Sequence, residues 1–317
     1  MKVLITGGAG FIGSHIADRL LVEGHEVVIL DDLTTGHVER VPPGARFYQM
    51  DVHSPWLEEL FKIEQPQAVV HQAAQASVRR SVDDPVFDAG VNVLGTVALL
   101  QTSVRHGVRR VLFASTGGAL YGDAELTPTP EDYPTLPVSP YGASKLAGEV
   151  YLRTFHAVHG LSYAALRYAN VYGPRQDPHG EAGVVAIFSR RLLSGEVARI
   201  NGDGTQTRDF VYVGDVAEAN VRALTSEAIG SFNVGTGVET DINAVFQLLR
   251  RLTGSSQAEV HGPPMPGEQR RSVVDARKIE KVMGWRPTTS LEAGLTATAR
   301  YFREAQGVPA TAPGRPA

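Results

Sequence analysis

The first half of the chain alternates short apolar runs with longer segments whose apolar residues recur every three or four positions. The runs are rich in valine, isoleucine and leucine on both faces, which predicts strands of a buried parallel sheet. They lie at Lys2–Thr6, Glu26–Leu30, Arg46–Met50, Ala68–Gln72, Arg110–Ser115 and Ser162–Arg167. The segments between them predict helices at Phe11–Glu23, Pro55–Ile63, Val91–His106 and Pro140–His159. This alternation is typical of a doubly wound α/β fold.

From about Tyr172 the pattern is less regular, and glycine, proline and arginine cluster in "VYGPRQDPHGEAG" and "NGDGTQTRDF". Helical periodicity persists in four segments. They are Val185–Leu193, Asp215–Leu224, Asp241–Leu252 and Leu291–Glu304. We therefore expect a first domain over residues 1–171 and a smaller mixed α/β lobe over 172–305, with some later segments returning to the first domain. Residues 306–317 have little to bury and are predicted to be disordered.

Composition narrows the class of protein. The 317 residues are 43% hydrophobic and 20% charged, as in an ordinary globular protein, and the net charge of −4 does not suit a nucleic-acid partner. There is no cysteine, which excludes disulfides, thiolate metal sites and thiol nucleophiles. No apolar run approaches the ~20 residues that span a bilayer. We expect a cytoplasmic protein without a membrane partner.

The ten histidines do not predict a metal site. Two of them, His156 and His159, lie three residues apart near the end of a predicted helix, but no third ligand follows at a suitable spacing. His71 ends an apolar strand and is interpreted as a packed core residue rather than a catalytic base.

The opening stretch "MKVLITGGAGFIG" places Gly7, Gly10 and Gly13 between a strand and a helix. Glycines let such a turn adopt positive φ and let a phosphate approach the backbone at the helix N-terminus. Asp31 ends the second strand, where a carboxylate binds ribose hydroxyls and repels a 2′-phosphate, so the pattern favours NAD over NADP. The alternative is a glycine-rich turn without a ligand. Asp32 joins the candidate cofactor residues, although a solvated turn residue is its simpler interpretation.

The stretch "SPYGASK" carries the candidate chemistry. Ser139 can cap a helix on which Tyr141 and Lys145, four residues apart, share a face. A free tyrosine has a pKa near 10, and a nearby ammonium together with positively charged NAD would favour its phenolate. Ser115 and Thr116 end a strand at the edge of the sheet where ligands bind. Taken alone, the pair also fits an amphipathic helix with a surface lysine.

Eight segments in order resemble the extended short-chain dehydrogenase/reductase family, especially its nucleotide-sugar epimerases and dehydratases. They are "TGGAGFIG", "DDL", "HQAAQASV", "VNVLGT", "FASTGGALYG", "YGASK", "LRYANVYGPRQ" and "GDGTQTRDFVYV". The resemblance extends to about Phe302. It implies a Rossmann-type doubly wound parallel sheet with a smaller substrate lobe, and a homodimer formed through the helices near Val91 and Tyr141.

The resemblance also implies roles for individual residues. The catalytic set would be Thr116, Tyr141 and Lys145. NAD would contact Gly7, Gly10, Phe11, Ile12, Gly13, Asp31, Asp51, Val52, Gln72, Ala73, Ala74, Asn92, Ser115, Tyr141, Lys145 and Tyr168. The nucleotide sugar would contact Thr116, Asn170, Arg208, Glu268, Arg271 and Ser272.

Within the family, the motifs are most similar to isomerases that interconvert UDP-glucose and UDP-galactose at carbon 4. Gly117 and Gly118 stand where the dehydratases carry an acid pair, which argues against elimination of water. The expected activity is therefore NAD-dependent 4-epimerisation of a UDP-hexose. The alternatives are an epimerase of another nucleotide sugar, such as UDP-glucuronate, and a non-catalytic NAD-binding module.

Two departures bear on the substrate. Met265 occupies the place of an arginine that grips the nucleotide in the epimerases, so Arg270 or Arg271 would have to substitute. Ser272 stands at the position that borders carbon 2 of the sugar, and its small side chain implies that N-acetylated sugars fit as well.

Overall fold

The structure is a computed structural model that describes residues 1–179, 183–265 and 269–308. Its centre is a parallel sheet of seven strands in the order β3–β2–β1–β4–β5–β6–β11. These strands are β1 (Lys2–Thr6), β2 (Glu26–Asp31), β3 (Arg46–Gln49), β4 (Ala68–His71), β5 (Arg110–Thr116), β6 (Ser162–Tyr168) and β11 (Gly230–Val234). The Rossmann-type fold expected from the sequence is confirmed, and β11 is a strand that the sequence pattern does not predict.

Helices cover both faces of the sheet because successive strand residues point to opposite sides. Val3 and Ile5 of β1 belong to one apolar core and Leu4 to the other. The first core is closed by α1 (Phe11–Val22), α8 (Val213–Thr225) and α10 (Arg277–Met283). The second is closed by α2 (Leu57–Glu64), α5 (Gly95–Arg105) and α6 (Pro140–His159). Both faces of the sheet are therefore buried, as a parallel sheet requires.

Helix α6 begins and ends at residues suited to those positions. The Ser139 hydroxyl accepts a hydrogen bond from the Gly142 amide at 3.1 Å, and Pro140 occupies the first helical position. The helix ends at His159 and is capped by Gly160, whose φ of 71° is a left-handed conformation that glycine adopts without strain. Local chemistry thus sets the start of the helix one residue before Tyr141.

The segment before α5 is more broken than the pattern predicts. It forms the short helices α3 (Val78–Asp83) and α4 (Pro85–Ala89), followed by one π-helical segment, η2 (Gly90–Leu94), that leads into α5. The single predicted helix over 91–106 is therefore a π turn joined to an α-helix. Such π turns are often found at functional sites.

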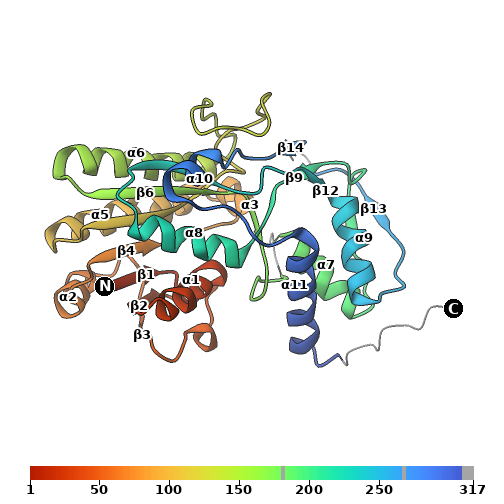
Figure 1. Cartoon of the computed structure of the whole chain (residues 1–317), viewed down its shortest axis with the longest axis horizontal. Helices are drawn as coiled ribbons and strands as arrows, with labels where there is room; N and C mark the ends of the chain where they lie inside the picture. Colours follow the sequence, from red (N-terminus) through yellow and green to blue (C-terminus); the bar gives the residue numbers. More distant parts are fainter. Residues whose placement is uncertain (180–182, 266–268, 309–317) are drawn as a thin grey trace.

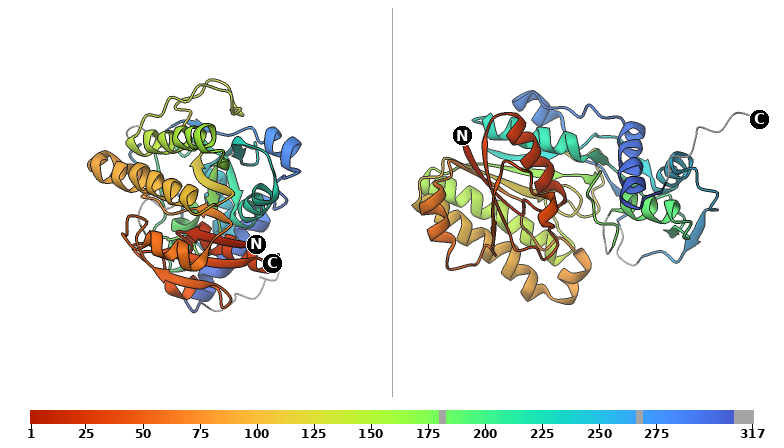
Figure 2. Two further views of the ribbon diagram at one scale, coloured as in Figure 1. Left: turned by 90° about the vertical axis from the view of Figure 1, so that its left-hand side faces the viewer. Right: turned by 90° about the horizontal axis from the view of Figure 1, so that it is seen from below.

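The later part of the chain forms a third apolar cluster beside the sheet. Its helices are α7 (Val184–Leu193), α9 (Ile242–Thr253) and α11 (Leu291–Ala305), which lie together at the right of Figure 1 and again at the right in the view from below in Figure 2. Small sheets accompany them, made of β7 (Asn170–Tyr172), β8 (Arg199–Asn201), β9 (Thr207–Arg208), β10 (Phe210–Tyr212), β12 (Thr240–Asp241), β13 (Val260–Gly262) and β14 (Arg271–Ser272). The domain boundary at residue 171 stays a prediction. Among the described residues, no helix has the length and apolar character needed to cross a membrane.

A buried ion pair ties α6 to the sheet. The Arg167 guanidinium of β6 donates to Glu149 of α6 at 2.7 Å, and both side chains are 7% exposed. The same carboxylate accepts hydrogen bonds from the Ser115 hydroxyl of β5 at 2.5 Å and the Ser231 hydroxyl of β11 at 2.7 Å. Four elements are thereby joined one residue away from Thr116 and Tyr168.

We expect Glu149→Ala to lower the free energy of unfolding by about 3–5 kcal/mol, because Arg167 would remain buried without its partner. The measurement is urea unfolding followed by circular dichroism. The control is Glu292→Ala, which breaks the Arg251–Glu292 pair, whose side chains are 63% and 61% exposed. That change should cost less than about 1 kcal/mol. Equal losses in the two variants would contradict the stabilising role of the buried network.

Candidate active site

The strand order reverses between β1 and β4, and in open parallel sheets ligands bind beyond the strand ends at such a point. The loops after these two strands approach each other closely. Gly7 has φ +70°, and a Cβ built on it would lie 2.6 Å from the Ala73 amide nitrogen. A Cβ on Gly13 would lie 2.2 Å from the Gly7 carbonyl oxygen. Glycine is therefore required at both positions, which explains two of the three glycines of the opening motif.

The start of α1 has the properties of an anion site. The N-cap residue Gly10 gives the helix no side-chain hydrogen bond, and the first turn holds no acidic residue. The amides of the first turn have no acceptor within the helix, so a phosphate can take their hydrogen bonds. This turn fits the pyrophosphate of NAD, with Phe11 and Ile12 contributing to it.

The Asp31 carboxylate lies beside the same turn. Its oxygens accept hydrogen bonds from the amides of Ala9 and Leu33, each at 2.9 Å, and the residue is 5% exposed. Burial raises the pKa of Asp31, and the backbone hydrogen bonds oppose that rise. Asp32 is exposed and accepts a hydrogen bond from the Thr34 amide at 2.8 Å, as a solvated turn residue does.

Three further predicted cofactor residues lie around the loops after β3 and β4. The exposed Asp51 carboxylate accepts hydrogen bonds from the amide and ring of His53, at 2.6 and 2.7 Å. The Val52 side chain is buried in the second core. Asn92 is buried, and its amide group bonds both the amide and the carbonyl of Gln75, each at 2.9 Å. Asn92 thus holds the loop that carries Gln72–Ala74.

Tyr141 and Lys145 come together on α6. The Lys145 Nζ atom lies 5.9 Å from the centre of the Tyr141 ring and 5.0 Å from that of Phe113, and Lys145 is 4% exposed. Burial raises the pKa of Tyr141 to about 12, and Asp88 adds to the rise. Burial lowers the pKa of Lys145 to about 8, against the opposing effect of Asp88. The polypeptide alone therefore disfavours the phenolate.

A cleft of about 450 Å³ opens at this edge of the sheet. Eight residues singled out in the sequence line it. They are Phe11, Ile12, Ser115, Thr116, Tyr141, Tyr168, Asn170 and Arg208. The motifs that carry these residues are spread over about two hundred positions of the chain, so it is the fold that brings them together.

Hydrogen bonds orient two of the lining side chains. The Tyr168 hydroxyl lies between the side chains of Gln72, whose Nε2 donates to it at 3.1 Å, and Asn220 of α8, whose Nδ2 donates at 2.9 Å. The Thr116 hydroxyl accepts from the Ala119 amide at 3.2 Å. The Ser115 hydroxyl instead donates to Glu149, so Ser115 serves the buried network.

The predicted nucleotide-sugar residues fall in different places. Ser272 of β14 pairs in register with Arg208 of β9, and a Cβ built on Gly118 would lie 3.7 Å from the Ser272 hydroxyl and 3.9 Å from that of Thr116. Ser272 is thus beside the cleft. Arg271 forms an ion pair with Glu239, in which its Nε donates at 3.0 Å. Glu268 lies outside the described residues.

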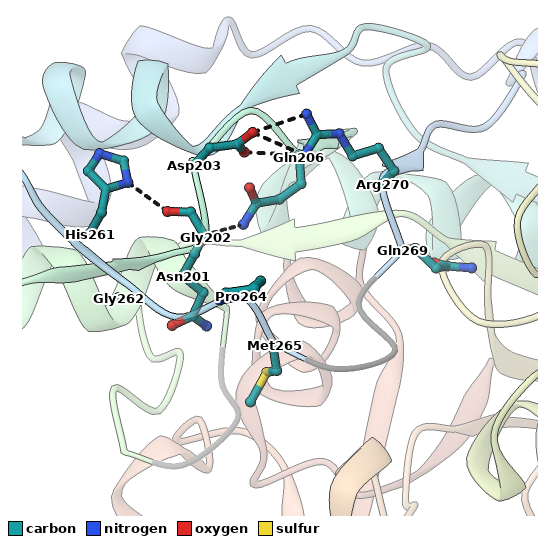
Figure 3. Close-up of a pocket in the computed structure, with 10 residues that line it drawn as sticks. All are labelled: Asn201, Gly202, Asp203, Gln206, His261, Gly262, Pro264, Met265, Gln269 and Arg270. Carbon is teal, nitrogen blue, oxygen red and sulfur yellow. Dashed lines mark hydrogen bonds and ion pairs between the residues drawn. The ribbon is translucent and has the colours of Figure 1, made fainter.

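A second hollow, of about 710 Å³, lies at the edge formed by β8 and β13, and we call it the outer hollow. It contains Met265 and Arg270, whereas Arg271 is not part of its lining. Figure 3 shows the Arg270 guanidinium turned toward Asp203, with a nitrogen–oxygen distance of 3.2 Å, and Met265 pointing away from that pair.

Several residues around the cleft escape the sequence interpretation. Gln176 lines the cleft and lies within the quoted "GPRQ" stretch. Glu149 follows Lys145 by four residues on the same predicted helix, and this spacing could have indicated that the two side chains lie close together. Asn220 has no such signal, because its partner Tyr168 lies far away in the sequence. Asp88 lies in a segment with no predicted helix, and its partners Gln75 and Ser144 are 13 and 56 residues away.

Comparisons with known proteins agree with this geometry. A sequence model described as the NAD dependent epimerase/dehydratase family matches residues 3–235. The crystal structure of UDP-glucose 4-epimerase with UDP-glucose from Thermotoga maritima superposes with a TM-score of 0.95 at 47% identity, covering 96% of this chain and 100% of that one. The UDP-glucose 4-epimerase from Thermus thermophilus in complex with NAD has a TM-score of 0.92, the same 47% identity and the same coverage.

A third solved structure is a UDP-N-acetylglucosamine 4-epimerase from Methanobrevibacter ruminantium M1 in complex with UDP-N-acetylmuramic acid. It is 34% identical with a TM-score of 0.91, and covers 96% of this chain and 98% of that one. The likeness in sequence and in structure extends over nearly the whole chain, and the resemblance drawn from the motifs is confirmed. The chain therefore belongs to the NAD dependent epimerase/dehydratase family.

Proposed function

We propose that this protein interconverts UDP-glucose and UDP-galactose by inverting carbon 4 of the sugar through a transient 4-keto sugar. The observation that carries the proposal is that Tyr141, Thr116, Asn170 and Arg208 line one and the same cleft. The first two suit a sugar hydroxyl and the last two a diphosphate. The full-length likeness to UDP-glucose 4-epimerases supports the same activity.

The residues present fit NAD. The glycine-rich turn after β1, the uncapped start of α1 and the Asp31 carboxylate would hold its pyrophosphate and ribose. When bound, NAD supplies a hydride acceptor for carbon 4 and a positive charge near Tyr141. That charge is needed because burial alone raises the pKa of the Tyr141 phenol to about 12.

The chain's own residues account for the proton transfer and the positioning. The Tyr141 phenolate takes the proton from the 4-hydroxyl group while Thr116 Oγ1 holds the same oxygen. The Lys145 ammonium stabilises the phenolate. Arg208 and Asn170 keep the nucleotide diphosphate in place, so the sugar can turn within the cleft and present its other face before the proton returns from Tyr141.

The structure strengthens the argument against dehydration. A Cβ built on Gly117 would lie 2.6 Å from a methyl carbon of Val274 and 3.3 Å from the carbonyl oxygens of Arg167 and Tyr168. An acidic side chain has no room there unless β5 or its neighbours move. The dehydratases eliminate water with two acidic side chains at these positions. Here only Gly118 has space for a side chain, so the pair does not fit.

The sugar specificity follows from the neighbourhood of carbon 2. Ser272 leaves space beside Thr116, which supports use of N-acetylated UDP-hexoses as well. UDP-glucuronate is the weaker alternative, since Arg208 is the one arginine among the described cleft residues and the diphosphate requires it. A non-catalytic NAD-binding module is disfavoured because Tyr141, Lys145 and Thr116 are all retained. The cytoplasmic location and the homodimer stay predictions.

We expect Tyr141→Phe to lower kcat for UDP-galactose by about 10²–10⁴-fold, because the proton acceptor is lost, while NAD binding changes little. Product analysis after incubation with UDP-galactose measures the first effect, and the NAD content of the purified protein measures the second. The control is Tyr151→Phe on the same helix, where the residue is 39% exposed and turnover should not change. Substantial turnover by Tyr141→Phe would rule out the role as base.

Asp31→Asn should weaken NAD binding by about tenfold or more, because a charged hydrogen-bond acceptor is removed. It should also reduce the preference for NAD over NADP, because the carboxylate no longer repels a 2′-phosphate. Isothermal titration with each dinucleotide provides the measurement. The neighbouring Asp32→Asn is the matched control and should bind like the unaltered protein. An unaltered preference for NAD over NADP in Asp31→Asn would show that another residue recognises the adenosine ribose.

Ser272→Tyr should reduce turnover of UDP-N-acetylglucosamine by about tenfold or more relative to UDP-glucose, because the phenol ring would occupy the space beside carbon 2. The ratio of kcat/KM for the two sugars is the quantity to compare. Ser256→Tyr changes an exposed serine away from the cleft and should leave that ratio unchanged. An equal loss on both sugars in Ser272→Tyr would contradict the specificity argument.

A further inference from the structure

Asp88 is a fully buried carboxylate that the mechanism above does not use. It lies on α4 at 0% exposure. One oxygen accepts hydrogen bonds from the side-chain amides of Gln75 and Asn92, each at 2.9 Å. The other accepts from the Ser144 hydroxyl at 2.6 Å. All three donors are neutral, so these bonds satisfy the carboxylate without cancelling its charge.

These bonds reach both sides of the candidate site. Gln75 belongs to the loop after β4, whose earlier residues Gln72–Ala74 are predicted to contact NAD, and Asn92 clamps that loop by bonding the Gln75 backbone. Ser144 lies on α6, between Tyr141 and Lys145 in the sequence. A single carboxylate therefore fixes the position of the loop after β4 relative to α6, the helix that carries the proposed base.

We propose that Asp88 is a positioning residue that aligns α6 with the loop after β4 and places a buried negative charge at Ser144, the residue that precedes Lys145. The proposal deepens the function proposed above and rests on it. It explains why a buried carboxylate is kept here with neutral partners, when burying a charge is costly unless the charge is used.

The Asp88 charge favours the Lys145 ammonium, and the same charge raises the pKa of Tyr141, so the phenolate depends on Lys145 and on bound NAD. Burial lowers the pKa of Lys145 to about 8, and Asp88 is the group that opposes the fall. Without that opposition, Lys145 would lose its proton closer to neutral pH. His71 is the other titratable group that acts on Lys145, from β4, but burial lowers the pKa of His71 to about 3, so its ring is neutral. The Nδ1 atom of this ring lies 2.6 Å from the Thr6 hydroxyl, and its Nε2 atom lies 3.0 Å from the Thr96 hydroxyl.

Among the other elements packed around Asp88, α6 carries one more buried charge, Glu149, which is paired with Arg167, whereas η2 and α3 add none. The segment η2 reads "GVNVL" and has no titratable side chain. The titratable residues of α3, which are Arg79, Arg80 and Asp83, are exposed. On β5, Arg110 lies at the opposite end of the strand and donates to the carbonyls of Ala223 and Ala228.

Two variants separate charge from hydrogen bonding. In Asp88→Asn, the amide oxygen can still accept from Gln75 and Asn92, and the amide nitrogen can donate to Ser144 Oγ once that hydroxyl rotates. This variant keeps the shape and the bonds but removes the charge. Ser144→Ala keeps the charge but removes the bond to α6. Unfolding midpoints of both variants establish that they fold.

The first measurement is the titration of Lys145 itself in the NAD-loaded protein. The chain has five lysines, so ¹³Cε-lysine NMR resolves them and Lys145→Arg assigns the signal. Asp88→Asn should lower the titration midpoint of Lys145 by about one pH unit, as expected when one opposite charge is removed from a protein interior. Ser144→Ala should leave it in place. An unchanged midpoint in a folded Asp88→Asn protein would overturn the charge role.

The second measurement is the pH dependence of kcat with UDP-galactose. Because the active form needs a Lys145 ammonium, Asp88→Asn should move the alkaline limb to lower pH, whereas Ser144→Ala should reduce kcat several-fold at every pH. A Ser144→Ala protein with unaltered kcat would overturn the alignment role. If the unaltered protein converts no UDP-hexose, the proposed function fails, while the NMR midpoint still decides the role of the Asp88 charge.

Discussion

The candidate site depends on a close approach of two backbone segments. The turn after β1 passes so near the loop after β4 that a Cβ on Gly7 would meet the Ala73 amide, and the start of α1 packs so tightly on that turn that a Cβ on Gly13 would meet the Gly7 carbonyl. These contacts leave the amides of the α1 N-terminus facing the opening between the two strands. A ligand phosphate can approach those amides because glycine at positions 7, 8 and 10 leaves most of the turn without side chains.

The site buries two side chains, Tyr141 and Lys145, whose proposed roles require them to be charged. Tyr141 and Lys145 lie in a poorly solvated corner in which burial favours the neutral form of each. Neighbouring charges must therefore set the protonation of the pair. Asp88 acts on both residues from α4, and a bound dinucleotide adds a charge of opposite sign. Buried hydrogen-bond networks hold these elements in place, since Glu149 and Arg167 lock α6 to three strands and Asp88 locks it to the loop after β4.

Local features of the protein can be predicted from its sequence. The period of apolar residues predicts six strands of the sheet and its main helices, and the glycine spacing, Asp31 and the Tyr141–Lys145 pair mark one edge of the sheet. These features depend on residues a few positions apart, or on a strand end whose place in a parallel sheet is general. The roles of the individual site residues stay predictions.

The long-range features are visible only in the folded chain. The pairing of β11 with β6, the position of Ser272 beside Thr116 and the engagement of Arg271 by Glu239 join segments that are far apart in the chain. Periodicity carries no information about such pairings. The raised pKa of Tyr141 also depends on the tertiary structure. The sequence shows the nearby Lys145, but it does not show how strongly both side chains are desolvated or that the Asp88 charge acts on them.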